Sequence, residues 1–255
     1  MPAPSGSLRH SVCKWCYPDI PLEVLAQAAR GLGLDSIELL DPVDWPVLKK
    51  YGLTCAMANG TTTIAKGFNR LEHHAAYVPS MVERIGVCAA AGIPGVICFS
   101  GNRDGLDDEQ GLANCAAGLR RIVGAAEQAG VTVCMELLNS RVDHPDYMCD
   151  HTAWGVELCR RVGSERFKLL YDIYHMQIME GDVIRTIREH AGCIGHYHTG
   201  GVPGRHEIDD SQELHYPAIM RAIKATGFTG FVGQEFIPSR DPLTELRAAV
   251  QRCSV

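Results

Sequence analysis

Short apolar runs alternate with longer amphipathic segments along almost the whole chain. The apolar runs have the length of buried strands, and they predict strands at 11–16, 36–40, 53–58, 96–99, 131–138, 167–173, 193–198 and 231–236. Helical patterns follow them at 21–33, 45–51, 71–91, 107–128, 152–162, 183–190, 217–226 and 242–252. Strict alternation of this kind indicates parallel strands that are joined by helical crossovers.

Eight strand–helix units in 255 residues predict an α/β protein with the closed (β/α)8 arrangement of a TIM barrel. The expected organisation is a single domain over residues 1–255, with residues 1–9 as a flexible lead-in. A doubly wound open sheet is the main alternative. It would usually show a glycine-rich phosphate turn after the first strand, and CKWCYPD is not such a turn.

Composition narrows the possible partners. The net charge of −6 argues against a general nucleic-acid surface, and the 46% hydrophobic content supports a large core. No apolar run has the length of a membrane span, and the first residues lack the apolar centre of a secretory signal. We therefore expect a small-molecule substrate, with neither nucleic acid nor membrane as a partner.

The 11 cysteines lie mostly inside apolar runs, which is typical of reduced, buried thiols and predicts a cytoplasmic protein. Cys13 and Cys16 form a CxxC pair, but the chain has no second pair of this kind. We expect neither a redox nor a zinc function from it.

Four predicted strands, the fifth to the eighth, end in a carboxylate or a histidine. These residues are Glu136, Asp172, His198 and Glu235. Because the carboxyl ends of barrel strands meet on one face, the four side chains are expected to form one site. Three carboxylates in one small site need a cation, and oxygen ligands with one imidazole favour Mn²⁺ or Mg²⁺, with Co²⁺ as a further choice.

Two alternatives stay open at this point. His196 shares a strand face with His198, so strand parity does not decide which histidine belongs to the site. Any one of the acids, taken alone, is equally well explained as a helix cap or as half of a loop ion pair.

Three motifs resemble the hydroxypyruvate isomerase family, which belongs to the xylose isomerase-like TIM barrels beside the ketose 3-epimerases. They are YDIYHMQIMEGD, GHYHTGGVPGRHE and the closing GQEF, and the resemblance covers nearly the whole chain. It implies that Glu136 and Glu235 are the acid/base pair close to the metal, and that Asp172 is a ligand.

The resemblance further implies that His175 contacts the substrate, that Arg205 holds a substrate oxygen, and that the chain forms a homodimer. One position departs from the pattern. Typical members resemble this chain but carry glutamine in place of His198, and histidine there is more similar to the 3-epimerases.

The residues and the resemblance lead to the same expected chemistry. It is a metal-dependent isomerase of the aldose–ketose type, an intramolecular oxidoreductase, which moves a proton through an enediolate. The best expectation is conversion of hydroxypyruvate to tartronate semialdehyde, and the alternatives are a ketose 3-epimerase or a 2-oxotetronate isomerase.

The sequence gives less support to two further classes of function. An endonuclease IV-like metal phosphodiesterase would need histidines after the third and fourth strands, where the chain has Ala58-Asn59-Gly60 and Ser100-Gly101-Asn102. A non-catalytic sugar-binding barrel would be favoured by the loss of either glutamate, and both are present.

Overall fold

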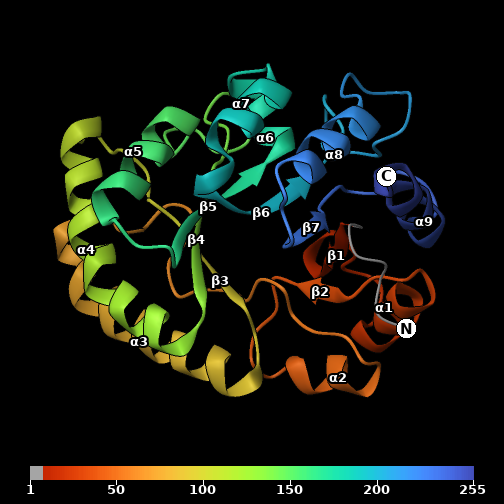
Figure 1. Ribbon diagram of the computed structural model, residues 1–255, viewed down its shortest axis with the longest axis horizontal. Coiled ribbons are helices and arrows are strands. Elements are labelled where there is room, and N and C mark those ends of the chain that lie inside the picture. The colour runs from red at the N-terminus through yellow and green to blue at the C-terminus, as the bar shows by residue number, and fades with distance from the viewer. Residues whose placement is uncertain (1–7) are drawn as a thin grey trace.

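A single parallel sheet forms the centre of the computed structural model, which describes residues 8–255 (Figure 1). Its strands run in the order β2-β1-β7-β6-β5-β4-β3 and curl round as the wall of a barrel. Their bounds are β1 (Arg9–Cys13), β2 (Ser36–Glu38), β3 (Gly95–Cys98), β4 (Thr132–Glu136), β5 (Phe167–Asp172), β6 (Ile194–Thr199) and β7 (Phe231–Gln234). The predicted α/β barrel is therefore confirmed.

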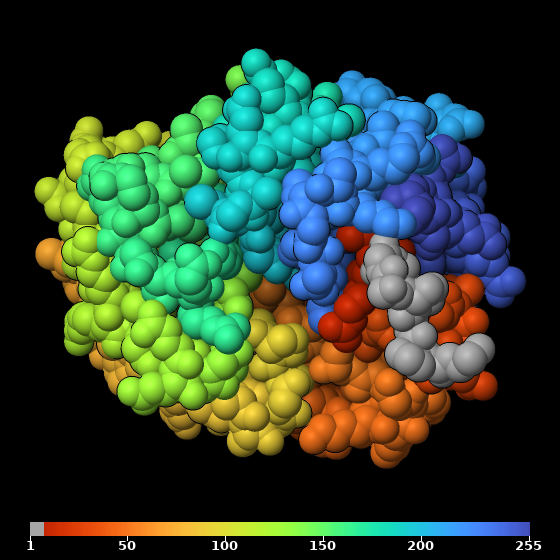
Figure 2. Space-filling view, viewed as in Figure 1, coloured from red at the N-terminus to blue at the C-terminus, as the bar shows by residue number. Residues whose placement is uncertain are grey.

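Helices surround the sheet on the outside (Figure 1). They are α1 (Leu22–Gly31), α2 (Trp45–Lys50), α3 (His74–Ala91), α4 (Asp108–Ala129), α5 (Thr152–Val162), α6 (Ile173–Met179), α7 (Val183–His190), α8 (Tyr216–Ala225) and α9 (Pro242–Cys253). Colour passes in order around the rim of the space-filling view, from orange through yellow and green to blue, so successive units are neighbours (Figure 2). Among residues 8–255, every helix is too short or too polar to cross a bilayer.

The predicted strand at 53–58 is not a regular strand. It occupies the place between β2 and β3 and joins both through isolated parallel bridges, from Ser36 to Thr54, and from Ala58 to Leu40 and Val96. The ladder is interrupted because the Ser36 hydroxyl, rather than a carbonyl, accepts the N–H of Ala56 at 2.7 Å. The eighth position of the barrel is thus filled by a segment that makes backbone hydrogen bonds to both neighbours, such as Ile37 N to Thr54 O and Ile97 N to Ala58 O, but forms no continuous ladder.

Two further sequence expectations need correction. The flexible lead-in expected at residues 1–9 is shorter than predicted, because Arg9 is the first residue of β1. Residues 1–7 lie outside the described part of the chain. The pattern also missed α6, which follows β5 directly. Its N-cap is Asp172, whose Oδ1 accepts the backbone N–H of His175 at 3.1 Å. This short helix turns His175 back over the carboxyl edge of the sheet.

The cysteines agree with the expectation of reduced thiols. All of them are free, and all except Cys159 and Cys193 are buried. Cys13 lies at the end of β1, and Cys16 lies in the 3₁₀ turn that follows.

Arg103 ties together the loops that follow β3 and β4, and its loss is expected to destabilise the fold. Its guanidinium donates to both carboxylate oxygens of Asp150 at 3.2 Å and to the backbone oxygen of Met148 at 3.4 Å. Arg103→Ala leaves the Asp150 carboxylate without this cation, so we expect the free energy of unfolding to fall by about 2–3 kcal/mol. Urea denaturation measures the change. Exposed Arg141→Ala is the control and is expected to cost less than about 0.5 kcal/mol; equal losses for the two variants would refute this role for Arg103.

Candidate active site

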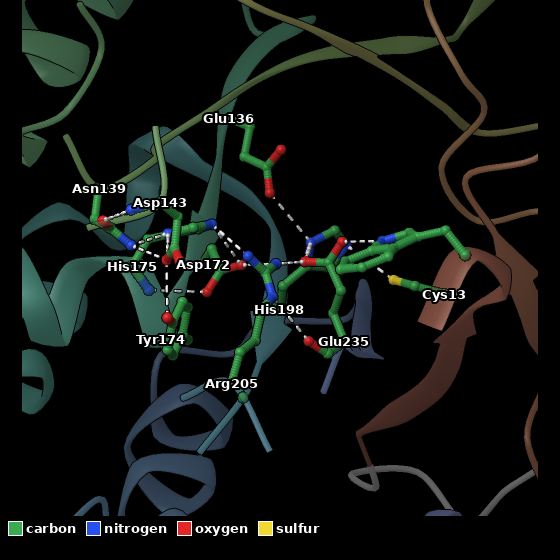
Figure 3. A network of polar contacts seen from close by, with 12 residues as sticks. Cys13, Glu136, Asn139, Asp143, Asp172, Tyr174, His175, His198, Arg205 and Glu235 are labelled. Atoms are coloured by element: carbon green, nitrogen blue, oxygen red, sulfur yellow. Dashed lines mark hydrogen bonds and ion pairs between the residues drawn. The ribbon is translucent and has the colours of Figure 1, made fainter. Parts of the chain in front are cut away.

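Four of the residues singled out from the sequence meet at the carboxyl edge of the sheet. Glu136 ends β4, Asp172 ends β5, His198 lies in β6, and Glu235 directly follows β7. One ligand atom from each lies within 4.8 Å of the others, and all four side chains are buried. Figure 3 shows these side chains together with Arg205 in one network of polar contacts. Parallel strand order therefore brings together residues that are up to a hundred positions apart in the chain.

The imidazole of His198 faces two of the carboxylates. Its Nδ1 lies 2.7 Å from Oε2 of Glu235 and 3.4 Å from Oε1 of Glu136. Among the described residues, neither Nδ1 nor Glu136 Oε1 has a hydrogen-bond partner of ordinary geometry. Buried polar atoms of this kind are costly unless they are paired. A site with oxygen donors, one imidazole nitrogen and two such atoms fits a divalent cation.

Arg205 supplies positive charge to the same site. Its Nη2 donates to Asp172 Oδ2 at 2.9 Å and also contacts Glu235 Oε2, and its Nε donates to the backbone oxygen of Glu235 at 3.2 Å. The backbone of Arg205 has a φ of +58°, a left-handed conformation that costs about 1–3 kcal/mol in a non-glycine residue. The loop after β6 is thus held in a strained form that directs the guanidinium into the site (Figure 3).

The ring of His175 is held in place by Asn139, which lies in the loop that follows β4. Asn139 Oδ1 accepts backbone N–H groups of Val142 and Asp143, so its Nδ2 must point to His175 Nδ1, 2.6 Å away. Nε2 of the same ring faces Arg205 Nη1, also at 2.6 Å. Each ring nitrogen therefore faces a donor, and a neutral ring, which has one acceptor nitrogen, accepts from only one of the two. His175 thus has one ring nitrogen whose N–H is open to an oxygen acceptor such as a substrate oxygen.

Burial and neighbouring charges shift the pKa values of these groups apart. Burial raises the pKa of Glu136. It also raises the pKa of Asp172, to about 8, against the opposing charge of Arg205. Burial would raise the pKa of Glu235 as well, but Arg205 and His198 hold that pKa well below its usual range. The pKa values of the two glutamates are therefore shifted in opposite directions, so Glu136 holds a proton more readily than Glu235 does.

A cavity of about 410 Å³ opens beside these residues. Its polar lining residues are Asn59, Glu136, His144, His175, Arg205 and Glu235, and its apolar and aromatic lining residues are Trp15, Leu39, Ile64, Ile97, Phe99 and Leu138. Among the described residues that line it, Arg205 is the sole side chain with a permanent positive charge. The cavity has the size for one small molecule.

The structure shows which of the two histidines on this face of β6 lies among the acids. His198 lies among the three acids, whereas His196 Nε2 bonds Glu38 Oε1 at 2.8 Å, away from Asp172. Sequence reasoning missed Glu38, although an acid inside the apolar run SIELL is the same signal that identified the other acids. Trp15 is 44% exposed, and its Nε1 donates to Glu235 Oε1 at 2.7 Å, so its indole lies beside this carboxylate in the lining of the cavity.

Comparison with known proteins gives a consistent picture. Residues 26–253 match the family model described as "Xylose isomerase-like TIM barrel". A human protein named "Putative hydroxypyruvate isomerase" is 28% identical over 237 residues, which cover 91% of this chain and 80% of that protein. A Pectobacterium atrosepticum protein named "2-oxo-tetronate isomerase" is 25% identical over 238 residues, or 87% of this chain and 88% of that protein.

A solved structure described as "AP endonuclease, family 2 from Brucella melitensis" superimposes on this chain with a TM-score of 0.83. Its sequence is 25% identical, and the match covers 94% of this chain and 97% of that one.

Proposed function

The chain belongs to the xylose isomerase-like TIM barrel family, and on that premise we propose that it is a metal-dependent isomerase of a small 2-oxo acid or ketose. Hydroxypyruvate, converted to tartronate semialdehyde, is the best-supported substrate. The observation that carries the proposal is the cluster of Glu136, Asp172, His198 and Glu235 beside a cavity of small-molecule size. The two curated relatives, both named as isomerases of oxo acids, support the reaction class.

Glu136, Asp172, His198 and Glu235 are the residues that would hold the metal. The fit rests on their oxygen-rich donor set and on the two buried atoms without hydrogen-bond partners. Mn²⁺ or Mg²⁺ is the expected ion, with Co²⁺ as a further choice. When bound, it would polarise adjacent carbonyl and hydroxyl oxygens of the substrate as a Lewis acid.

Glu136 and Glu235 would move the proton. One glutamate takes a proton from C3 of hydroxypyruvate, and that C–H electron pair forms the C2–C3 double bond of an enediolate. The hydroxyl proton passes from the C3 oxygen to the C2 oxygen, and a proton added at C2 completes tartronate semialdehyde. The opposite pKa shifts of the two glutamates suit such a pair, because this step needs one base and one acid.

Arg205 and His175 would orient the substrate. The guanidinium is planar and permanently charged, so it suits a carboxylate, and the imidazole of His175, which has one donor and one acceptor nitrogen when neutral, suits a hydroxyl oxygen. A 2-oxo acid uses the charge of Arg205 more fully than a neutral sugar does. This favours hydroxypyruvate or 2-oxotetronate over a free ketose, whereas histidine at position 198 favours a 3-epimerase.

A phosphodiesterase role is less consistent with the site. The segments Ala58-Asn59-Gly60 and Ser100-Gly101-Asn102, which end the third and fourth units, contain no histidine for a multi-zinc cluster. Among the described residues that line the cavity, Arg205 supplies the sole fixed cation, and it is already paired with Asp172.

The proposal is tested by offering the Mn²⁺-loaded protein hydroxypyruvate, 2-oxotetronate, D-fructose and an abasic-site oligonucleotide in separate assays. Turnover of an oxo acid at the highest kcat/KM is the expected result. Faster epimerisation of D-fructose would assign the protein as a 3-epimerase instead of an oxo-acid isomerase. Cleavage of the oligonucleotide strand, with no turnover of the other three compounds, would overturn the proposal.

Mn²⁺ affinity is expected to rise with pH. Burial raises the pKa of Asp172 to about 8, so below that pH the ion must displace a proton from this carboxyl group. Each displaced proton weakens binding by about tenfold per pH unit below the pKa. Calorimetric titrations from about pH 6 to about pH 8 in two buffers of different ionisation enthalpy measure both the affinity and the protons released. A Kd that stays constant over this range would contradict the claim that Asp172 is a metal ligand whose pKa is raised by burial.

A further inference from the structure

Glu38 lies deeper in the barrel than the proposed ligands and contacts one of them. It ends β2 and is fully buried, and the sheet order places two strands, β1 and β7, between it and β6. Its Oε1 nevertheless reaches His198 Nε2 at 2.7 Å and His196 Nε2 at 2.8 Å. The carboxylate therefore crosses the interior of the barrel to meet two imidazoles that share one face of β6.

The space for this contact is provided by Gly233 in β7. A Cβ atom at Gly233 would lie 2.3 Å from Glu38 Oε1 and 2.8 Å from His198 Cδ2. Real side chains do not approach so closely, so any larger residue would push the carboxylate or the ring aside. The missing side chain leaves room for this one pair of groups.

The chemistry of the two partners fixes where the ring proton lies. An ionised carboxylate accepts hydrogen bonds and donates none, so His198 Nε2 must carry a proton at 2.7 Å from Glu38 Oε1. The other ring nitrogen, Nδ1, is the one that faces Glu136 and Glu235. A neutral ring with its proton on Nε2 presents a lone pair at Nδ1, and a metal ion binds that form of imidazole.

We propose that Glu38 is a positioning residue that keeps the proton of His198 on Nε2 and so makes Nδ1 the nitrogen available to the divalent ion. This inference rests on the proposed metal site. Cys13 is a further neighbour, with its Sγ 3.6 Å from Glu38 Oε1 and 3.7 Å from His198 Nε2. The thiol is a weaker donor than the imidazoles and leaves the preference of the carboxylate for them unchanged.

A second metal ion held by Glu38, His196 and His198 is a competing explanation, because their ligand atoms also lie within 4.8 Å of one another. Both Nε2 atoms face the same oxygen, Oε1, whereas Oε2 has no hydrogen-bond partner among the described residues. An ion bound by Glu38 and both histidines through Nε2 would have to displace the proton of each ring. We therefore expect one divalent ion per chain.

The position of the proton is measured directly on the unaltered protein. Long-range ¹H–¹⁵N correlation spectra of ¹⁵N-histidine-labelled, Mg²⁺-saturated protein distinguish protonated from unprotonated ring nitrogens. His198→Gln identifies the His198 signals by their loss. The expected result is a protonated Nε2 and an unprotonated Nδ1, and the reverse tautomer would overturn the inference without any variant of Glu38.

Variants test the effect on metal affinity. Removing an outer partner of a ligating histidine typically weakens metal binding 10- to 100-fold, and Glu38→Leu is expected to raise the Mn²⁺ Kd by about that factor. Glu38→Gln keeps an acceptor oxygen and is expected to fall between wild type and Glu38→Leu. Gly233→Ala disturbs the same contact sterically and is expected to weaken binding as well.

Ser36→Ala is the matched control on the same strand. It removes a buried hydroxyl that bonds Ser11 at 2.9 Å and Ala56 N at 2.7 Å, so it disturbs β2 without touching His198. Its Mn²⁺ Kd is expected to stay within about threefold of wild type. Equal affinities for wild type and a folded Glu38→Leu would overturn the inference alone, whereas a wild-type protein that binds no Mn²⁺ would overturn the proposed function with it.

Discussion

Glu136→Gln and Glu235→Gln are each expected to lower kcat by roughly 10²–10⁴-fold while the protein stays folded, because general acid/base catalysis supplies an enhancement of that size. Glutamine has nearly the same shape as glutamate but neither removes nor returns a proton at neutral pH. Both side chains are buried beside the cavity, with Glu136 and Glu235 at 5% and 3% exposure. Glu136→Gln removes a carboxylate whose pKa is raised by burial, so the metal-free fold is not expected to weaken. Glu235→Gln removes a charge that Arg205 and His198 stabilise, so a loss of stability is expected for that variant.

Steady-state rates on hydroxypyruvate, with circular dichroism and urea denaturation of each variant, measure these effects. Asp150→Asn is the matched control, because Asp150 is another buried carboxylate, held by Arg103 and Ser140 outside the cavity. We expect it to lower stability and to leave kcat within about twofold of wild type. A glutamine variant that keeps near-full activity would remove that glutamate from the mechanism.

Removal of divalent metal is expected to abolish turnover and to reduce stability. Arg205 then remains beside three buried acidic groups, and Glu235, against the effect of burial, raises the pKa of His198, so that its Nδ1 takes up a proton in place of the ion. Added Mn²⁺ at a hundredfold excess over its Kd is expected to raise the free energy of unfolding by about 2.7 kcal/mol. Thermal unfolding and activity are measured after dialysis against a chelator and again after Mn²⁺ is restored.

The control in that experiment is K⁺ at matched ionic strength, which is expected to restore neither property. Elemental analysis establishes that the dialysed protein is free of metal. Full activity in such a sample would contradict the proposed role of the four ligands, whatever the substrate proves to be.

The location of the site was predictable because it follows from topology. Glu136, Asp172, His198 and Glu235 each end a buried apolar run, and parallel strands bring such ends to one edge. A charged residue inside an apolar run is costly unless it is paired, which makes it visible in a single sequence. The same signal was present at Glu38 in SIELL, and it was missed because the carboxylate lies one layer deeper, among histidines rather than among acids.

Other features depended on contacts between distant residues and were not visible in the sequence. The segment 53–58 has the composition of a strand, but the hydroxyl of Ser36 replaces one of its ladder partners. The role of Asn139 depends on two backbone N–H groups that fix its amide against His175. Helix α6 begins inside a run that reads as a continuous strand, because Asp172 serves as both strand end and N-cap.

The most direct test of the proposed reaction is proton NMR of hydroxypyruvate with the Mn²⁺-loaded protein in D₂O, after removal of the ion from the quenched sample. The proposal predicts tartronate semialdehyde, loss of the C3 proton signal, and no such change with the Glu136→Gln/Glu235→Gln double variant. Hydroxypyruvate that stays unchanged, with both C3 protons retained, while D-fructose exchanges its C3 proton, would contradict the isomerase assignment and identify a ketose 3-epimerase.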